Sequence, residues 1–168
     1  MALRDIIQYP DPFLRQPTKA LTEIGPDLEE LIADMAETMY AEPGVGLAAN
    51  QIGVDKSIIV FDVAPHDQPR NLNVLINPQI ISSVGSMVSE NEGCLSVPDL
   101  RADVKRAAQV LVTGLDRQGN FVEIQGEGLL SVVLQHEIDH LNGVLFLDRI
   151  SALKRQLYQR RIAKKLKG

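Results

Sequence analysis

The pattern of apolar and polar positions divides the chain into helical and strand-like segments. Apolar residues at spacings of three and four predict an amphipathic helix between Pro26 and Pro43. Its polar face is expected to carry four acidic residues: Glu29, Glu30, Asp34 and Glu37. Residues 127–141 are apolar on nearly all sides, which is typical of a buried helix, and Gly143 follows as a C-terminal cap. Ser151 is a favourable N-cap for a final helix.

Short apolar runs bounded by turn residues predict the strands. Proline cannot donate a hydrogen bond to a strand ladder, so Pro78 is expected to divide one apolar run into two strands. The turn at residues 117–120 predicts a hairpin between the strands on either side of it. The predicted strands cover residues 57–63, 73–77, 79–83, 87–90, 108–116 and 121–125.

The buried helix carries the pattern His136-Glu137-x-x-His140. Residues four apart share one face of a helix, so both imidazoles can reach one metal ion. Glu137 is rotated by about 100° from His136 and can border the site without being a ligand. Such an ion binds and acidifies water, and a nearby carboxylate can take the proton. The plainer alternative is a polar end of a core helix, but these ionisable groups would be costly to bury without compensation.

A metal site of this kind needs a third protein ligand. Position 146 is Phe146 rather than the histidine of one protease class, and no glutamate follows Asp148, so the ligand is expected upstream. Cys94 is the main candidate, although a lone cysteine can also be a small buried hydrophobic residue. His66 is a second candidate, but a histidine in a polar loop is more often only solvated.

Composition is that of an ordinary globular protein of one domain, with 168 residues. No apolar run approaches the ~18 residues of a membrane span, and the start lacks the apolar region of a signal peptide. A cytoplasmic location without a membrane partner is therefore expected. Charge is uneven: residues 151–168 hold seven Lys/Arg and no acid (+7), so the rest of the −5 chain carries −12.

Three segments together resemble the signature motifs of bacterial peptide deformylases, in the right order and at similar spacing. They are residues 44–51 (Gly-Val-Gly-Leu-Ala-Ala-Asn-Gln), 92–96 (Glu-Gly-Cys-Leu-Ser) and 135–140 (Gln-His-Glu-Ile-Asp-His). The resemblance covers essentially the whole chain. It implies an α+β fold, with antiparallel β-sheets packed around a central buried helix that carries the His-Glu-x-x-His motif. A single catalytic domain would span 1–168, with 151–168 as a basic C-terminal helix.

The resemblance also implies roles at the reaction centre. Cys94, His136 and His140 would be metal ligands, with water or hydroxide in the fourth position. Glu137 would be the general base and acid, and Gln51 and the backbone N–H of Leu95 would stabilise the oxyanion. Zinc suits this ligand set. The resemblance points to Fe(II) as the physiological ion, with Zn, Ni or Co able to replace it.

The substrate implied by the resemblance is the N-terminal formylmethionine of a nascent polypeptide, from which formate is released. The predicted binding residues are Val45 and Gly46, which would pair with the peptide backbone as an added strand, together with Glu92, Gly93 and Arg101, and Leu129, Val132 and Val133 around the methionine side chain. Glu90 departs from the family pattern, because apolar or aromatic residues are common there. The protein is expected to be a monomer whose basic C-terminal helix contacts ribosomal RNA.

Two other functions compete with this interpretation. One is an endopeptidase, against which Phe146 and the missing downstream ligand argue. The other is an RNA-binding protein with a structural metal, which would need a fourth protein ligand in place of water. Replacing Glu137 by glutamine distinguishes an enzyme from a binding protein, because only an enzyme would lose turnover while it keeps its metal.

Overall fold

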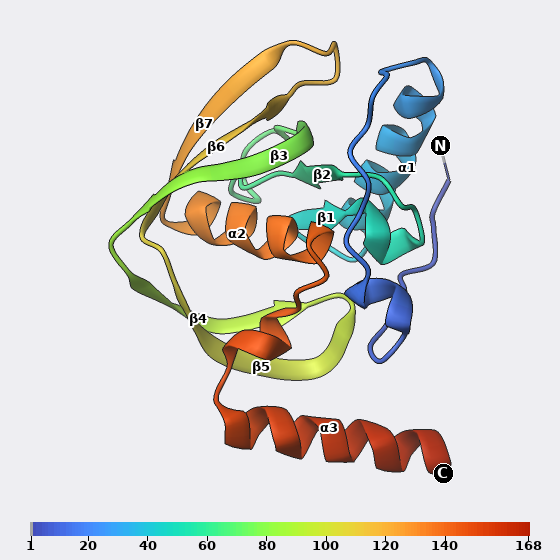
Figure 1. Ribbon diagram of the computed structural model, residues 1–168, viewed down its shortest axis with the longest axis vertical. Coiled ribbons are helices and arrows are strands. Elements are labelled where there is room, and N and C mark those ends of the chain that lie inside the picture. The colour runs from blue at the N-terminus through green and yellow to red at the C-terminus, as the bar shows by residue number, and fades with distance from the viewer. Residues whose placement is uncertain (1) are drawn as a thin grey trace.

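The computed structural model describes residues 2–168, which form an α+β arrangement (Figure 1). Its α-helices are α1 (Asp27–Ala41), α2 (Leu129–Leu141) and α3 (Ala152–Lys167). Its strands are β1 (Gly46–Ala48), β2 (Ile58–Phe61), β3 (Asn73–Val84), β4 (Met87–Cys94), β5 (Val97–Arg106), β6 (Gln109–Leu115) and β7 (Phe121–Glu127). Short 3₁₀-helices cover Pro12–Arg15, Ala49–Ile52 and Phe146–Arg149.

Helix α2 lies between two antiparallel sheets (Figure 1). The larger sheet has the strand order β1-β2-β3-β6-β7, and the smaller one pairs β4 with β5. Apolar side chains of α2 pack with the inner face of the larger sheet, where Val133 and Leu134 join Ile59 and Val112 in one cluster. The predicted α+β fold with antiparallel sheets around a buried central helix is therefore confirmed.

The buried helix begins later than its apolar pattern indicated. Gly128 has a φ of 61°, a backbone conformation that side chains other than glycine rarely adopt, and α2 starts at Leu129 rather than at residue 127. Its other end agrees with the prediction: Gly143 has a φ of 77° and its N–H donates to His140 O at 3.0 Å. Gly128 thus marks the start of α2, and Gly143 follows its polar end.

Asp34 was predicted to lie on the solvated face of α1, but it is buried. Its carboxylate accepts hydrogen bonds from Ala2 N at 2.7 Å and from Arg4 Nε at 2.9 Å. These bonds lower the pKa of Asp34 and attach the N-terminal segment to the helix. The apolar stripe of α1 is buried as expected.

Two strand predictions were wrong. Pro78 does not divide its run, because β3 continues through a bulge at which the pairing with β6 shifts between Ile76 and Gln79. Asn77, with a φ of 52°, takes up the bend. The sequence interpretation also missed β5 entirely and ended β4 too early, at residue 90. These two strands form the small sheet that carries Cys94 to its place under α2.

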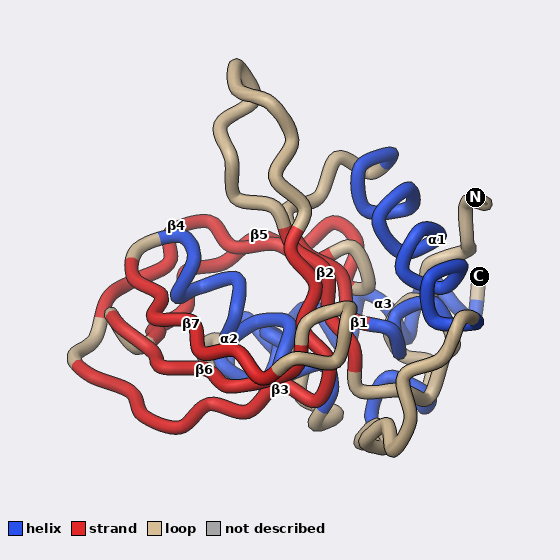
Figure 2. The backbone as a smooth tube through the Cα atoms, turned by 90° about the horizontal axis from the view of Figure 1, so that it is seen from above, coloured by secondary structure: helices blue, strands red, loops and turns tan. Residues whose placement is uncertain are grey.

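Helix α3 packs on the small sheet through Tyr158 and Ile162. The hydroxyl of Tyr158 donates to Pro98 O at 2.7 Å. Seen from above, both ends of the chain lie on the same side of the molecule (Figure 2). None of the helices in residues 2–168 combines the length and the apolar character that a membrane span requires.

Candidate active site

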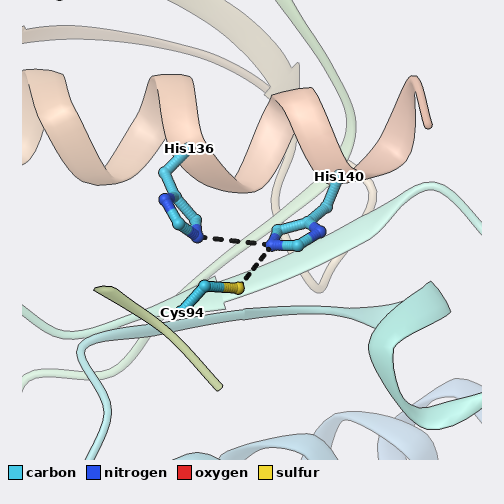
Figure 3. Close-up of side chains that lie close together, drawn as sticks. All are labelled: Cys94, His136 and His140. Atoms are coloured by element: carbon cyan, nitrogen blue, oxygen red, sulfur yellow. Dashed lines mark hydrogen bonds between the residues drawn. The ribbon is translucent and has the colours of Figure 1, made fainter. Parts of the chain in front are cut away.

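Three potential metal ligands converge between α2 and the end of β4 (Figure 3). The Nε2 atom of His140 lies 3.2 Å from Cys94 Sγ and 3.3 Å from His136 Nε2. All three donor atoms lie within 4.8 Å of one another. The structure thus brings together the three residues predicted as ligands, whereas His66 is exposed and is no part of this group.

The chemistry of these three donors fits a divalent ion such as zinc or iron. A thiol and two imidazole nitrogens are a common ligand set for both metals. His136 Nδ1 lies 2.7 Å from Glu92 Oε1, so Nδ1 carries the ring proton and the Nε2 lone pair is free to bind an ion. A shared cation would account for the close approach of these three electron-rich atoms.

Glu92 is hydrogen-bonded to the ligand His136 and to Arg106. Burial raises the pKa of Glu92, but hydrogen bonds from His136 and Arg106 outweigh it and bring the pKa to about 2. Arg106 Nε donates to Glu92 Oε2 at 3.2 Å, and Arg106 Nη2 donates to Glu92 Oε1. Both carboxylate oxygens are therefore occupied. The Glu92 side chain is thus placed to orient His136, and its predicted contact with substrate stays a prediction.

Glu137 lies beside the ligands with a carboxylate oxygen that no described residue engages. Its Oε1 is buried and lacks a hydrogen-bond partner in the structure. Burial raises the pKa of Glu137 to about 7. A Cβ atom added at Gly46 would lie 2.7 Å from Glu137 Oε2, so β1 passes this carboxylate at a distance that only glycine allows.

Gln51 places its side-chain amide next to the metal ligands. Its Oε1 accepts from Ala48 N at 2.9 Å, which fixes the direction of the amide. Its Nε2 donates to Ser96 Oγ at 3.0 Å and lies 3.8 Å from Cys94 Sγ. Ser96 is fully buried and was not singled out from the sequence.

A cleft of about 600 Å³ opens beside the ligands. One wall is β1, the outermost strand of the larger sheet, and the other is formed by β4 and β5. Side chains of α2 form the base. The cleft collects all residues predicted to act on substrate: Val45, Gly46, Gln51, Glu92, Gly93, Leu95, Arg101, Leu129, Val132, Val133 and Glu137. Their actions on a substrate stay predictions.

The rim of the cleft differs from its base in exposure. Val132 and Val133 are buried, whereas Leu129 is 54% exposed at the mouth. Glu90 is exposed on the cleft rim. The guanidinium of Arg101 packs on Gly93, where an added Cβ would lie 2.7 Å from Arg101 Cζ. This glycine therefore allows the arginine to lie flat along the cleft wall.

Sequence reasoning missed the charged residues behind the ligands. Arg106 is buried between Glu92 and Asp139, and Arg149 also binds Asp139. Arg106 shares the inward face of β5 with Ala102 and Val104. A charged residue that alternates in step with buried apolar residues along a strand indicates a buried charge. This pattern can be used only once the strand itself is recognised.

Comparison with known proteins agrees with this geometry. The sequence model of the family described as "Polypeptide deformylase" matches residues 3–156. The chain is 50% identical to the peptide deformylase of Desulfosudis oleivorans over 99% of this chain and 96% of that one.

Solved structures give the same result. The crystal structure of a peptide deformylase from Legionella pneumophila has a TM-score of 0.90 and 46% identity, covering 99% of this chain and 96% of the other. A Met-Ala-Ser-bound class I type b peptide deformylase from Acinetobacter baumannii has a TM-score of 0.84 and 35% identity, covering 89% and 99%. The chain therefore belongs to the polypeptide deformylase family, whose members are metal-containing enzymes that hydrolyse N-formylmethionyl peptides.

Proposed function

We propose that this protein removes the formyl group from the N-terminal formylmethionine of new polypeptides, with a divalent ion held by Cys94, His136 and His140. The observation that carries the proposal is the convergence of these three donors beside a cleft that Cys94, His136 and Glu137 line. When bound, the ion would lower the pKa of water to about 7 and so supply hydroxide at neutral pH. Fe(II) is the proposed physiological ion, and Zn, Ni or Co would occupy the same ligands.

The proton transfers are assigned to Glu137. Its buried, unpartnered carboxylate lies next to the ligands and can accept the proton of the attacking water. The same group then donates a proton to the amine that leaves as the new N-terminus. A free amine and formate are the products.

The negative charge that develops on the formyl oxygen needs hydrogen-bond donors. Gln51 Nε2 and the backbone N–H of Leu95 are proposed for this role, since both residues line the cleft beside Cys94. Each such donor is worth about 3 kcal/mol of transition-state stabilisation. The bond from Ala48 N to Gln51 Oε1 keeps the amide oriented before substrate arrives.

The peptide is proposed to bind as an extra strand along β1. The edge of β1 that faces away from β2 borders the cleft, so the backbone at Val45 and Gly46 is placed to pair with a substrate. The Acinetobacter baumannii relative was solved with Met-Ala-Ser, a peptide of the product type. Val132 and Val133 would surround its methionine side chain.

Formyl selectivity provides the test of this function. The space at Gly46 and Leu95 is proposed to admit a formyl hydrogen but not an acetyl methyl group. We expect formyl-Met-Ala-Ser to be hydrolysed at least ~100-fold faster than acetyl-Met-Ala-Ser, measured as new amine and as formate or acetate. Chelation should stop the reaction, and Fe(II) added without oxygen should restore it. Equal rates on both peptides, or cleavage of an internal bond in an unformylated peptide, would contradict the proposal.

The outward face of α3 is proposed to contact ribosomal RNA. Tyr158 and Ile162 face the body of the protein, which leaves Arg160, Lys164 and Lys167 exposed on the helix. Phosphate contacts of this kind make binding depend strongly on salt. The concentration of positive charge in this one element supports the proposal.

Charge reversal tests this partner better than truncation does, since truncation would uncover the apolar cluster that Tyr158 closes. We expect the triple variant Arg160→Glu, Lys164→Glu and Lys167→Glu to lose about tenfold or more in ribosome affinity at low salt and most of its salt dependence. Deformylation of a short peptide should not change. Ribosome binding equal to that of the unmodified protein would exclude this role of α3.

A further inference from the structure

We infer that Arg149 is a positioning residue for the ligand His136, acting through Asp139, Arg106 and Glu92. The inference rests on the proposed metal site. Arg149 is the last residue of the 3₁₀-helix Phe146–Arg149 and lies outside the cleft. Its side chain is 45% exposed, so on position alone it would be taken for an ordinary surface residue.

A continuous series of ionic hydrogen bonds joins Arg149 to His136. Arg149 donates twice to Asp139, from Nε to Oδ2 at 2.6 Å and from Nη2 to Oδ1 at 2.8 Å. Asp139 Oδ2 also accepts from Arg106 Nη1 at 3.1 Å. Arg106 holds both oxygens of Glu92, and Glu92 Oε1 lies 2.7 Å from His136 Nδ1. Each residue in the series is hydrogen-bonded directly to the next one.

The charges in this series balance only when Arg149 is included. Glu92 and Asp139 contribute two negative charges, and Arg106 is the one buried cation that they share. Arg149 supplies the second positive charge from the protein surface. An aspartate buried without sufficient compensation attracts the nearest cation strongly.

Loss of Arg149 would therefore act at a distance. Asp139 would be left with Arg106 alone, and Arg106 would be drawn from Glu92 toward Asp139. Glu92 would then be held less firmly, and with it the His136 ring that it orients. Residues that orient a metal-ligating histidine typically change metal affinity by about 10- to 100-fold when they are replaced.

The chain contains a closely matched control in Arg15. Its side chain is 40% exposed, and like Arg149 it donates two hydrogen bonds to one aspartate. That aspartate is Asp148, the neighbour of Arg149 in the 3₁₀-helix, at 2.5 Å and 3.1 Å. Asp148, however, has no hydrogen bond to any ligand or to Glu92 among those of the described residues. Arg15→Met and Arg149→Met therefore each remove a partly exposed arginine that donates two bonds to one aspartate, and only the second interrupts the series.

The measurement is the zinc dissociation constant of the full-length, zinc-loaded protein by competition with a chelator. We expect Arg149→Met to weaken zinc binding about 10-fold or more, and Arg15→Met to change it less than about twofold. Arg149→Lys keeps the charge but loses the double bond to Asp139, so an intermediate value is expected. This milder variant keeps the test decisive if Arg149→Met folds poorly.

A double-variant cycle identifies the route. In a Glu92→Gln background, Arg149→Met should have little further effect on zinc affinity, because the link to His136 is already weakened. Equal affinities for Arg149→Met and the unmodified protein, or equal losses for Arg149→Met and Arg15→Met, would overturn the inference. Full additivity with Glu92→Gln would overturn it as well. An unmodified protein that binds no metal would contradict the proposed function instead.

Discussion

Replacing Glu137 by glutamine is expected to lower kcat for formyl-Met-Ala-Ser by about 10³-fold while the metal remains bound. General acid–base catalysis typically contributes about 10²- to 10⁴-fold. Glutamine has nearly the same shape but can neither accept the proton of water nor return one to the amine. The substitution leaves Cys94, His136 and His140 untouched. Single-turnover rates and metal content, measured on the same preparation, give both quantities.

Glu123→Gln is the control for this substitution. Glu123 is exposed on β7 and lies outside the cleft, so its replacement should leave both kcat and metal content unchanged. Retained turnover in Glu137→Gln would remove Glu137 from the mechanism and would favour a binding protein with a structural ion. Loss of metal together with turnover would instead assign Glu137 to metal binding.

The parts of the site that were predictable are those in which spacing along the chain determines geometry. His136 and His140 are four residues apart on a helix, so their convergence follows from the helical repeat. Because no residue downstream of the helix can serve as the third ligand, an upstream ligand was expected, and Cys94 was the main candidate. The resemblance of residues 44–51 to a family motif then brought Gln51 and Gly46 to the same place, which pattern alone did not indicate.

The supporting charges could not be predicted because their partners are distant in sequence. Arg106 is 14 residues from Glu92 and 33 from Asp139. Strand β5 was missed because Pro98, Asp99 and its several charged residues make the alternation of apolar positions hard to recognise in the sequence. Ala102 and Val104 are the buried apolar residues of that strand. Without that strand, Arg106 had no predicted environment. The family resemblance assigned Glu92 to substrate binding, but it gave no sign that Arg106 and His136 engage its carboxylate.

Gly46→Ala is expected to reduce kcat/KM by about 10²-fold without unfolding the protein. An alanine Cβ would lie 2.7 Å from Glu137 Oε2 and 2.9 Å from Glu137 Cγ, closer than nonbonded carbon and oxygen atoms approach. Gly46 sits in β1 opposite Phe61, so the backbone is restrained and the carboxylate must move. A displacement of about 1 Å at a reacting group costs roughly 10²-fold in rate.

Two comparisons separate this local displacement from a general effect of removing glycine. Gly25→Ala, where an added Cβ meets nothing within 4 Å, should leave kcat/KM unchanged. If Gly46→Ala acts by moving Glu137, it should cost little more once Glu137→Gln has already removed the proton transfer, because the two substitutions then affect one step. A full 10²-fold loss in that background would instead mean that Gly46 acts mainly on the peptide. Comparing the loss of kcat/KM that Gly46→Ala causes in the unmodified protein and in Glu137→Gln thus shows whether β1 acts mainly by placing the carboxylate or by pairing with substrate.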